Sequence, residues 1–217
     1  MSGSVITVAS LKGGSGKTTL AISLAIHWLL HGRRAVLIDT DPRHAIVRLA
    51  ARHLALGGIE VITDASLEVW QTAKTLAQDH DIVIVDTPSF RSDVTAAGLA
   101  VADTILLPLR PSPLDLDLMI DTVHMLRSGI RGWAPSMLCV LTQTVKDSIV
   151  VRRMRHDLHE AGIPTLHEEM QMRVAYPTAA LQGATPSMLE PRGSAAHNVE
   201  AIAGEIESRL QPWRMAA

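Results

Sequence analysis

Residues 12–19 read Lys-Gly-Gly-Ser-Gly-Lys-Thr-Thr and have the residue types that hold a phosphate group. Glycines allow close approach and positive φ, so several backbone N–H groups can converge on an anion. A helix that begins at Lys17 would point the positive end of its dipole at the same place. Lys17 can then reach the β- and γ-phosphates of a nucleotide, and the Thr18 hydroxyl can hold Mg²⁺. The expected nucleotide contacts in this loop are Lys12, Gly13, Gly14, Ser15, Gly16, Lys17, Thr18 and Thr19.

The loop departs from the general phosphate-loop pattern at its first position. The pattern G-x-x-x-x-G-K-[ST] requires glycine at residue 11, where this chain has Leu11, and a second lysine, Lys12, follows it. Holding the loop in shape does not require a lysine at this position. The departure therefore indicates a special form of the loop, in which Lys12 has a role of its own.

Two aspartates lie at the end of the second predicted strand and just beyond it. Asp39 and Asp41 come after an apolar run that ends at residue 38. In open α/β sheets, ligands lie beyond the carboxyl ends of the strands. One of the two acids can contact the Mg²⁺ shell while the other orients an attacking water. We assign Asp39 to the metal and Asp41 to the water. The reverse assignment stays open, and so does a role for one of them as the N-cap of the next helix.

A third acid ends the hydrophobic run at residues 82–85. This arrangement is typical of a Walker B strand, and it makes Asp86 available to Mg²⁺ through water. The next residues, 87–90, read Thr-Pro-Ser-Phe and could sense the γ-phosphate and move on hydrolysis. The phosphate loop and the two acidic strand ends follow one another on successive strands, and together they make a strong signal, whereas any one alone would be weak.

Short apolar runs alternate with longer stretches of helical periodicity. Such alternation is typical of a parallel sheet with helices on both faces. We expect one α/β domain over residues 1–217, a three-layer sandwich with a mostly parallel, twisted sheet. Strands are predicted at 4–9, 35–39, 59–63, 81–86, 104–109 and 137–142, with a short edge strand at 164–166; helices are predicted at 17–31, 43–54, 66–78, 92–101, 114–128, 148–161 and 195–210.

Composition limits the possible classes of protein. Of the 217 residues, 47% are hydrophobic, which is enough for a sizeable core. The lone cysteine, Cys139, lies in an apolar run and is expected in that core. The longest mostly apolar stretch, residues 20–30, is shorter than the roughly 18 to 20 residues of a membrane span. With no room for a signal peptide before the first strand, we expect a cytoplasmic protein without a membrane partner.

The motifs at residues 12–19, 38–42 and 85–88 resemble the ParA/MinD family of deviant Walker A ATPases, a branch of the P-loop NTPases. The segments at 107–115 and 171–176 and the closing helix are similar to those of the small ParF-like plasmid-partition ATPases. This resemblance implies ATP and Mg²⁺ as cofactors. It also implies an ATP-dependent sandwich dimer in which Lys12 reaches the partner's phosphates, as an arginine finger does. Gln143 and Met172 are the further nucleotide contacts that we expect.

The resemblance also implies a working cycle. The ATP dimer would bind DNA without sequence preference, associate with the nucleoid, and release it after slow hydrolysis stimulated by a ParB-like or cargo-adaptor partner. The cargo would be a plasmid, a chromosome region or a protein microcompartment. The formal net charge of −2 requires that DNA contacts come from a local basic patch. The candidates for that patch are Arg152, Arg153, Arg155, Arg173 and Arg192.

Three other functions can be weighed against the sequence. A MinD-like membrane-associated regulator needs an interfacial tail helix with a Lys/Arg-rich polar face, which the last helix lacks. A metabolic ligase of the same superfamily needs no lysine acting across a dimer, so Lys12 counts against it. A nitrogenase-type reductase is excluded, because its bridging cluster needs two cysteines per subunit and only Cys139 is present.

Overall fold

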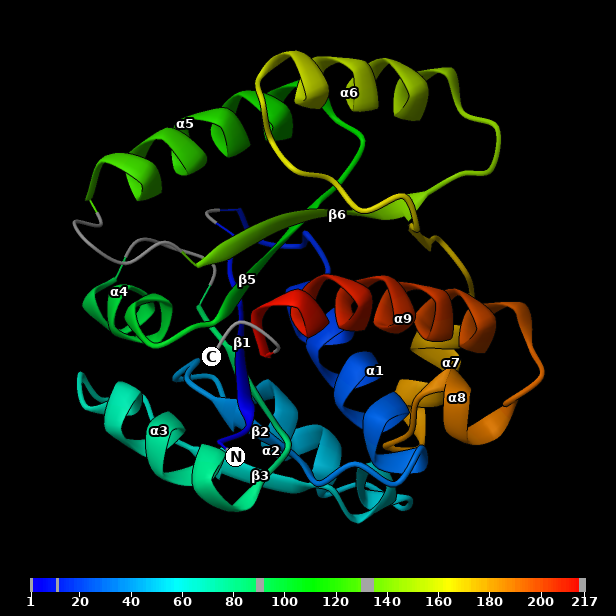
Figure 1. The fold of residues 1–217 in the computed structure, drawn as a ribbon. Coiled ribbons are helices and arrows are strands. Elements are labelled where there is room, and N and C mark those ends of the chain that lie inside the picture. The colour runs from blue at the N-terminus through cyan, green and yellow to red at the C-terminus, as the bar shows by residue number, and fades with distance from the viewer. Residues whose placement is uncertain (1, 11, 89–91, 130–134, 215–217) are drawn as a thin grey trace.

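The computed structural model describes residues 2–10, 12–88, 92–129 and 135–214. Its strands form a seven-stranded sheet in the order β3-β2-β4-β1-β5-β6-β7, and every strand pair is parallel (Figure 1). The predicted sandwich with a mostly parallel sheet is confirmed. The strands are β1 (Ser4–Val8), β2 (Ala35–Asp39), β3 (Glu60–Thr63), β4 (Ile82–Asp86), β5 (Thr104–Leu109), β6 (Ser136–Thr144) and β7 (Met170–Gln171).

Helices cover both faces of this sheet. One face packs against α1 and α9, and the other packs against α3 and α5. The helices are α1 (Lys17–Leu30), α2 (Ala45–Ala50), α3 (Val69–Asp79), α4 (Asp93–Ala100), α5 (Pro113–Gly129), α6 (Ile149–Glu160), α7 (Ala175–Leu181), α8 (Pro186–Leu189) and α9 (Ser194–Arg214), with a 3₁₀ turn, η1 (Ala55–Gly58), after α2.

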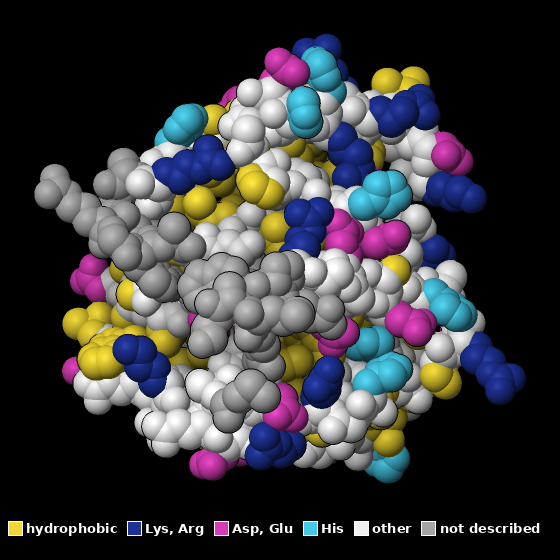
Figure 2. All heavy atoms as spheres, in the orientation of Figure 1, with side chains coloured by type: hydrophobic (Ala, Val, Ile, Leu, Met, Phe, Trp, Pro, Cys, Tyr) yellow, Lys and Arg dark blue, Asp and Glu magenta, His cyan; other side chains and the backbone are white. Residues whose placement is uncertain are grey.

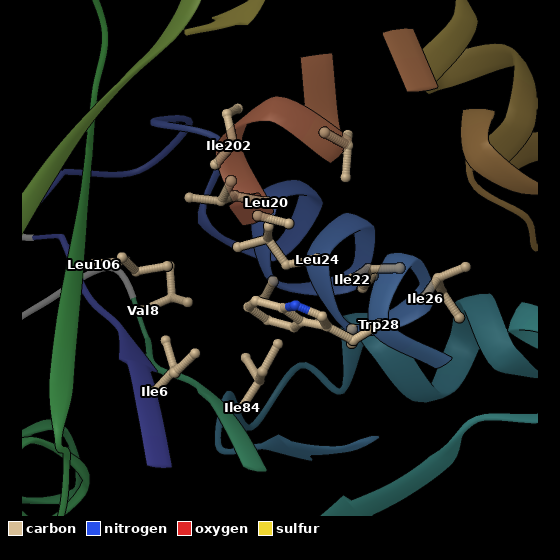
Figure 3. Close-up of a cluster of buried hydrophobic side chains, with 14 of the residues drawn as sticks. Ile6, Val8, Leu20, Ile22, Leu24, Ile26, Trp28, Ile84, Leu106 and Ile202 are labelled. Carbon is tan, nitrogen blue, oxygen red and sulfur yellow. The ribbon is translucent and has the colours of Figure 1, made fainter. Parts of the chain in front are cut away.

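The core explains why the strands are almost continuously apolar. Every residue of β1, β2, β4 and β5 is buried, because both faces of these strands are covered. Alternate residues face opposite layers: Ile6 and Ile84 contact the α1 side, whereas Val5 and Val83 contact the α3 side. Figure 3 shows Trp28 of α1 lying over Ile84 and Ile6 in the first of these layers.

The last helix is part of the fold. Val199, Ile202 and Ile206 of α9 are buried in the α1 layer. Trp28 Nε1 donates a hydrogen bond to Glu207 Oε1 at 2.8 Å, which fixes the far half of α9 on α1. Within the described parts of the chain, no helix has the length and apolar character needed to cross a bilayer.

Two predictions about the elements need correction, and two short helices were not predicted. The edge strand expected at 164–166 is reduced to a single bridge between Thr165 and Cys139, and the edge strand is β7. The helix expected at 43–54 is the shorter α2, because His44 takes a left-handed conformation before it and η1 follows it. The short helices α7 and α8 were missed, since four to seven residues are too few to show helical periodicity.

The turn between α7 and α8 makes a close backbone contact with the segment after α2. Leu54 and Leu56 donate backbone hydrogen bonds to the carbonyls of Gln182 and Gly183, at 2.9 and 2.7 Å. Gly183 has a φ of +69°, and a Cβ there would lie 2.7 Å from the carbonyl oxygen of Leu49. Only glycine permits both this conformation and this approach.

Replacing Ile202 by Ala tests how much stability the α9 contact contributes. Ile202 is fully buried, so the change should lower the free energy of unfolding by about 2 to 5 kcal/mol, because apolar packing is removed and a cavity is left. Urea unfolding followed by circular dichroism measures the difference. The exposed neighbour Glu200 provides the control, and E200A should stay within about 0.5 kcal/mol of the parent. Equal stability of the two variants would contradict the packing of α9.

Candidate functional site

The phosphate loop joins β1 to α1 at the carboxyl edge of the sheet, and β6 braces it from the side. Gly14 and Gly16 have φ values of +75° and +87°, so the chain uses the freedom of glycine at both positions. Thr142 Oγ1 donates to the Ser15 carbonyl at 2.7 Å, and Gln143 Nε2 donates to the Gly14 carbonyl at 2.6 Å. In this structure Gln143, expected as a nucleotide contact, therefore holds the loop that would contact the phosphates.

Lys17 begins α1 and only 5% of it is exposed. Burial lowers the pKa of its ammonium group, and the nearby carboxylates of Asp86 and Asp41 partly offset this effect. A cation at this helix N-terminus adds to the positive end of the helix dipole. The charge of Lys17 and the helix dipole both favour the binding of phosphate oxygens beside Lys17, as the motif predicts.

Thr18 and Asp86 form the centre of the candidate magnesium site. Thr18 Oγ1 donates to Asp86 Oδ2 at 2.7 Å, whereas Asp86 Oδ1 is buried without a hydrogen-bond partner among the described residues. Burial raises the pKa of Asp86 to about 7, against the opposing effects of Thr18 and Lys17. A buried, unsatisfied carboxylate oxygen beside a hydroxyl is a donor set that fits Mg²⁺. These two side chains would hold the ion, which supplies positive charge to phosphate oxygens.

Asp39 lies next to this pair but has a structural role of its own. Its carboxylate is fully buried and accepts from the backbone N–H groups of Asp41 and Ile46, both at 3.1 Å. The sequence leaves open that one of the two acids supports the start of the next helix, and Asp39 does so through Ile46. Its assignment to the metal shell stays a prediction.

Asp41 is held by the arginine two residues later. Arg43 donates from its backbone N and from Nε to Asp41 Oδ1, at 2.9 and 3.0 Å, and from Nη2 to Oδ2 at 2.8 Å. The side-chain hydrogen bond from Arg43 is the main reason that the pKa of Asp41 lies below its ordinary value. The acid assigned to the attacking water is thus ionised and paired in this structure.

Lys12 bends back onto its own subunit. Its ammonium group pairs with Asp115 Oδ1 at the start of α5, and Arg110 Nε donates to Asp115 Oδ2 at 2.9 Å. Only 3% of the Asp115 side chain is exposed, against 37% for Lys12. Burial alone would raise the pKa of Asp115, but the hydrogen bonds from Lys12 and Arg110 outweigh it and hold the pKa below its ordinary value.

Sequence reasoning assigned no role to Asp115 or Arg110. Both lie in the segment at 107–115 that resembles the ParF-like ATPases, so the signal was present without a residue-level interpretation. The two cations on one buried carboxylate show that Lys12 must leave Asp115 before it can act elsewhere. Arg110 would then keep the carboxylate paired, which lowers the cost of that step.

The expected base-binding side of the site is open and apolar. Met172 and Val174, just after β7, are 64% and 79% exposed, and Val145 after β6 is 62% exposed. The Met172 N–H donates to the Thr144 carbonyl at 2.9 Å, so the loops after β6 and β7 lie side by side. A cavity of about 290 Å³ lies on the α1 side of the phosphate loop, between Thr19 and the segment at 176–186.

Arg155 and Arg173, two of the basic residues expected to contact DNA, are engaged inside the fold. Arg155 donates to Glu169 Oε1 and to two backbone carbonyls in the loop before β7. Arg173 donates to the side chains of Gln171 and Asn198. These bonds position the β7 region and hold both guanidinium groups against the fold.

The other candidates for DNA contact are accessible. Arg152 and Arg192 are exposed, and Arg153 forms an exposed ion pair with Asp157 on α6. Figure 2 shows Lys and Arg side chains scattered over this view of the molecule, with Asp, Glu and His between them. The surface in this view thus has no single dense basic patch.

Two sequence predictions fall on residues outside the described ranges. Leu11, which breaks the general loop pattern, is one, and Ser89 with Phe90 of the candidate γ-phosphate sensor are the others. The described part of that segment is buried: Thr87 Oγ1 donates to the Val8 carbonyl at 2.9 Å. This bond ties the end of β4 to the end of β1, just before the phosphate loop.

The family model of the CobQ/CobB/MinD/ParA nucleotide binding domain matches residues 6–186. The chain belongs to this family. A carboxysome distribution protein A from Halothiobacillus neapolitanus is 32% identical over 207 residues, which cover 93% of this chain and 95% of that one. A ParA protein from Rhizobium radiobacter is 26% identical, covering 95% and 97% of the two chains.

Solved structures of the ParA/MinD family have the same fold. The apo form of a Cyanothece McdA superposes with a TM-score of 0.78 at 19% identity, covering 94% of this chain and 99% of that one. The cell division ATPase MinD of Pyrococcus furiosus gives 0.73 at 19% identity, covering 95% and 99%. With the family established, this ParA/MinD-type chain is an ATPase whose cofactors are ATP and Mg²⁺.

Replacing Asp115 by Asn tests the pairing of Lys12 with its own subunit. The variant should lose about 1 to 3 kcal/mol of the free energy of unfolding at pH 7, because two cations lose a buried ionised partner. The folded-state pKa of Asp115 is lowered, so its contribution is present above the unfolded pKa of about 4 and disappears as the pH falls through the folded value.

Urea unfolding at pH 7 and near pH 3 measures both parts of this prediction. The difference in stability between D115N and the parent should shrink at the lower pH. D117N, on the exposed face of the same helix, provides the matched control and should leave stability unchanged. A difference that is the same at both pH values would contradict an ionised Asp115 in the folded state.

Proposed function

We propose that this ATPase positions a cargo on DNA: it forms a sandwich dimer with ATP, binds DNA without sequence preference, and releases it after hydrolysis stimulated by a partner protein. The observation that carries the proposal is Lys12. This lysine stands beside the phosphate loop, and its ammonium group is stored on Asp115 of its own subunit. When two subunits meet, the Lys12 side chain can leave Asp115 and bind the phosphates held by the other subunit.

The chemistry of such a dimer follows from the residues of each subunit. Lys17 and the loop N–H groups bind the phosphates, Thr18 and Asp86 hold the metal ion, and Asp41 orients the attacking water. Lys12 of the second subunit neutralises charge that develops on the phosphates, as an arginine finger does. Hydrolysis then requires a dimer, so the chain works as a switch whose state is set by the nucleotide.

The relatives support a positioning role and suggest the kind of cargo. Two curated proteins for carboxysome distribution, from Halothiobacillus neapolitanus and Gloeobacter kilaueensis, are 32% and 33% identical and match over nearly their whole length. The ParA protein and the Thermus thermophilus chromosome-partitioning ATPase Soj match at 26% and 24% identity. Among a plasmid, a chromosome region and a protein microcompartment, we favour the microcompartment. We also propose that the adaptor takes the place of a ParB-like partner.

The other members of the superfamily fit less well. A membrane-associated regulator would use the closing helix as its anchor, but Val199, Ile202 and Ile206 of α9 are buried against α1. A metabolic ligase would have no use for Lys12. The cytoplasm, with association to the nucleoid in the ATP state, is therefore the location that we propose.

Changing Lys12 to Ala separates nucleotide binding from the dimer cycle. K12A should bind ATP as a single subunit, because Lys17 and the loop remain, but it should lose the tight ATP dimer and stimulated hydrolysis. Calorimetry measures ATP affinity, light scattering measures the dimer, and phosphate release measures turnover. K17A is the comparison that should lose ATP binding itself. A K12A variant with the turnover of the parent would show that Lys12 does not act across a dimer.

Binding to DNA of arbitrary sequence is the direct test of the proposal. A mobility-shift assay with ATP, with ADP and without nucleotide should show binding with ATP alone. R152Q combined with R192Q should weaken this binding, and the dependence on salt should become shallower by about one unit of slope for each phosphate that is no longer neutralised. R33Q, on the exposed turn after α1 at the opposite edge of the sheet, is the control and should bind as the parent does. DNA binding that is equally strong with ATP, with ADP and without nucleotide would contradict the proposed cycle.

A further inference from the structure

The segment between β2 and α2 contains an arginine that contacts the proposed water-orienting acid. Arg43 uses the two ends of its guanidinium group on Asp41, with Nε to Oδ1 at 3.0 Å and Nη2 to Oδ2 at 2.8 Å. This is a bidentate pair, the strongest geometry between an arginine and a carboxylate. It fixes the plane of the carboxylate as well as its charge.

The two partners differ in exposure. The Asp41 side chain is 12% exposed, whereas the Arg43 side chain is 69% exposed. Arg43 therefore reaches from solvent onto an acid that lies at the edge of the phosphate and metal site. When Arg43 moves back into water, Asp41 keeps the hydrogen bond from the backbone N–H of residue 43 at 2.9 Å and the nearby positive charge of Lys17, so the acid is not left without stabilisation. The pair can therefore open without unfolding the loop.

The pair has a consequence for hydrolysis. An acid that orients the attacking water must accept a hydrogen bond from that water in a suitable direction. The fork of Arg43 lies across both oxygens of Asp41 and directs the carboxylate toward solvent-exposed nitrogen donors. Oδ1 already accepts two hydrogen bonds, from the backbone N–H and from Nε of Arg43, and the one acceptor position left on Oδ2 has its direction fixed by the fork. Releasing the fork frees a second and a third position and lets the carboxylate turn toward the attacking water.

We propose that Arg43 is a positioning residue that restrains hydrolysis, because its fork fixes the direction of the Asp41 carboxylate and takes two of the acceptor positions from which this acid could orient the attacking water. This inference rests on the role given to Asp41 in the proposed function. Slow hydrolysis by the chain alone is then partly a property of Arg43. A stimulating partner or the second subunit accelerates hydrolysis by drawing Arg43 away.

The rest of the loop would survive without the arginine side chain. The backbone N–H of residue 43 still donates to Asp41 Oδ1 at 2.9 Å, and Asp39 still accepts from the N–H groups of Asp41 and Ile46. A glutamine at residue 43 keeps these backbone bonds. R43Q should therefore fold as the parent does, with only the fork removed.

The experiment measures phosphate release and ATP affinity for the parent, R43Q, R43K and D41N, and for D41N combined with R43Q. R43Q should raise kcat without a stimulating partner by roughly three- to tenfold at unchanged KM, because only the transition state requires the free carboxylate. R43K keeps the charge but cannot form the fork, so its kcat should lie between those of the parent and of R43Q. R33Q replaces an exposed arginine far from the site, and its kcat should equal that of the parent.

The double variant shows whether Arg43 acts through Asp41. On the D41N background, R43Q should cause no increase, whereas a general effect on folding or surface charge would persist there. A lower or unchanged kcat in R43Q, with D41N inactive, would overturn the restraint and leave the proposed function intact. A D41N variant as active as the parent would instead refute the role of Asp41, and the restraint would fall with it.

Discussion

The hydrogen bond between Thr18 and Asp86 is the contact on which the rest of the site depends. It joins the first turn of α1 to the end of β4, which are 68 residues apart in the chain. It can form only because β4 lies between β1 and β2 in parallel register, with Asp86 beside both Val8 and Asp39. Parallel strands end at the same edge, so one register brings the phosphate loop and the acids of two strands together. The burial that keeps these strands apolar also leaves an unsatisfied oxygen where a cation would bind.

The parts of this site that sequence predicts are those fixed by the chain direction. Asp39 and Asp86 end apolar strands, and Lys17 begins a helix after glycines, so their common location follows from topology alone. The partners of Lys12 and Asp41 do not follow from it. Asp115 is 103 residues from Lys12, and the pair depends on where α5 begins relative to the loop. The sequence predicts Arg43 within a helix, but α2 begins later, and this places its guanidinium on Asp41.

A common electrostatic arrangement connects these two pairs. In the single subunit, the lysine that would act on a neighbour is neutralised by a buried acid, and the acid that would act on water is neutralised by an exposed arginine. Both reactive groups are therefore present but engaged. Since each pair joins a less exposed acid to a more exposed cation, the cation is the partner that can move into water, while Arg110 stays on Asp115 and the backbone N–H of Arg43 stays on Asp41. An anionic group of a second subunit or of a partner that binds Lys12 or Arg43 more strongly would release the acid that each now pairs with.

Gly183 has a consequence for how this chain can change over generations. Because Gly183 has no side chain, the turn between α7 and α8 can pack on the segment after α2. The acids Asp39 and Asp41 come before α2, and Met172 comes before α7. Any other residue would add a carbon 2.7 Å from the Leu49 carbonyl and from the Arg52 Cβ. The contact at Gly183 thus joins the acidic side of the nucleotide site to the Met172 side, and a larger residue at position 183 would push the two apart. Descendants of this protein can vary their surfaces, but a substitution at residue 183 would have to be matched by a shift of α2 and of the acids before it.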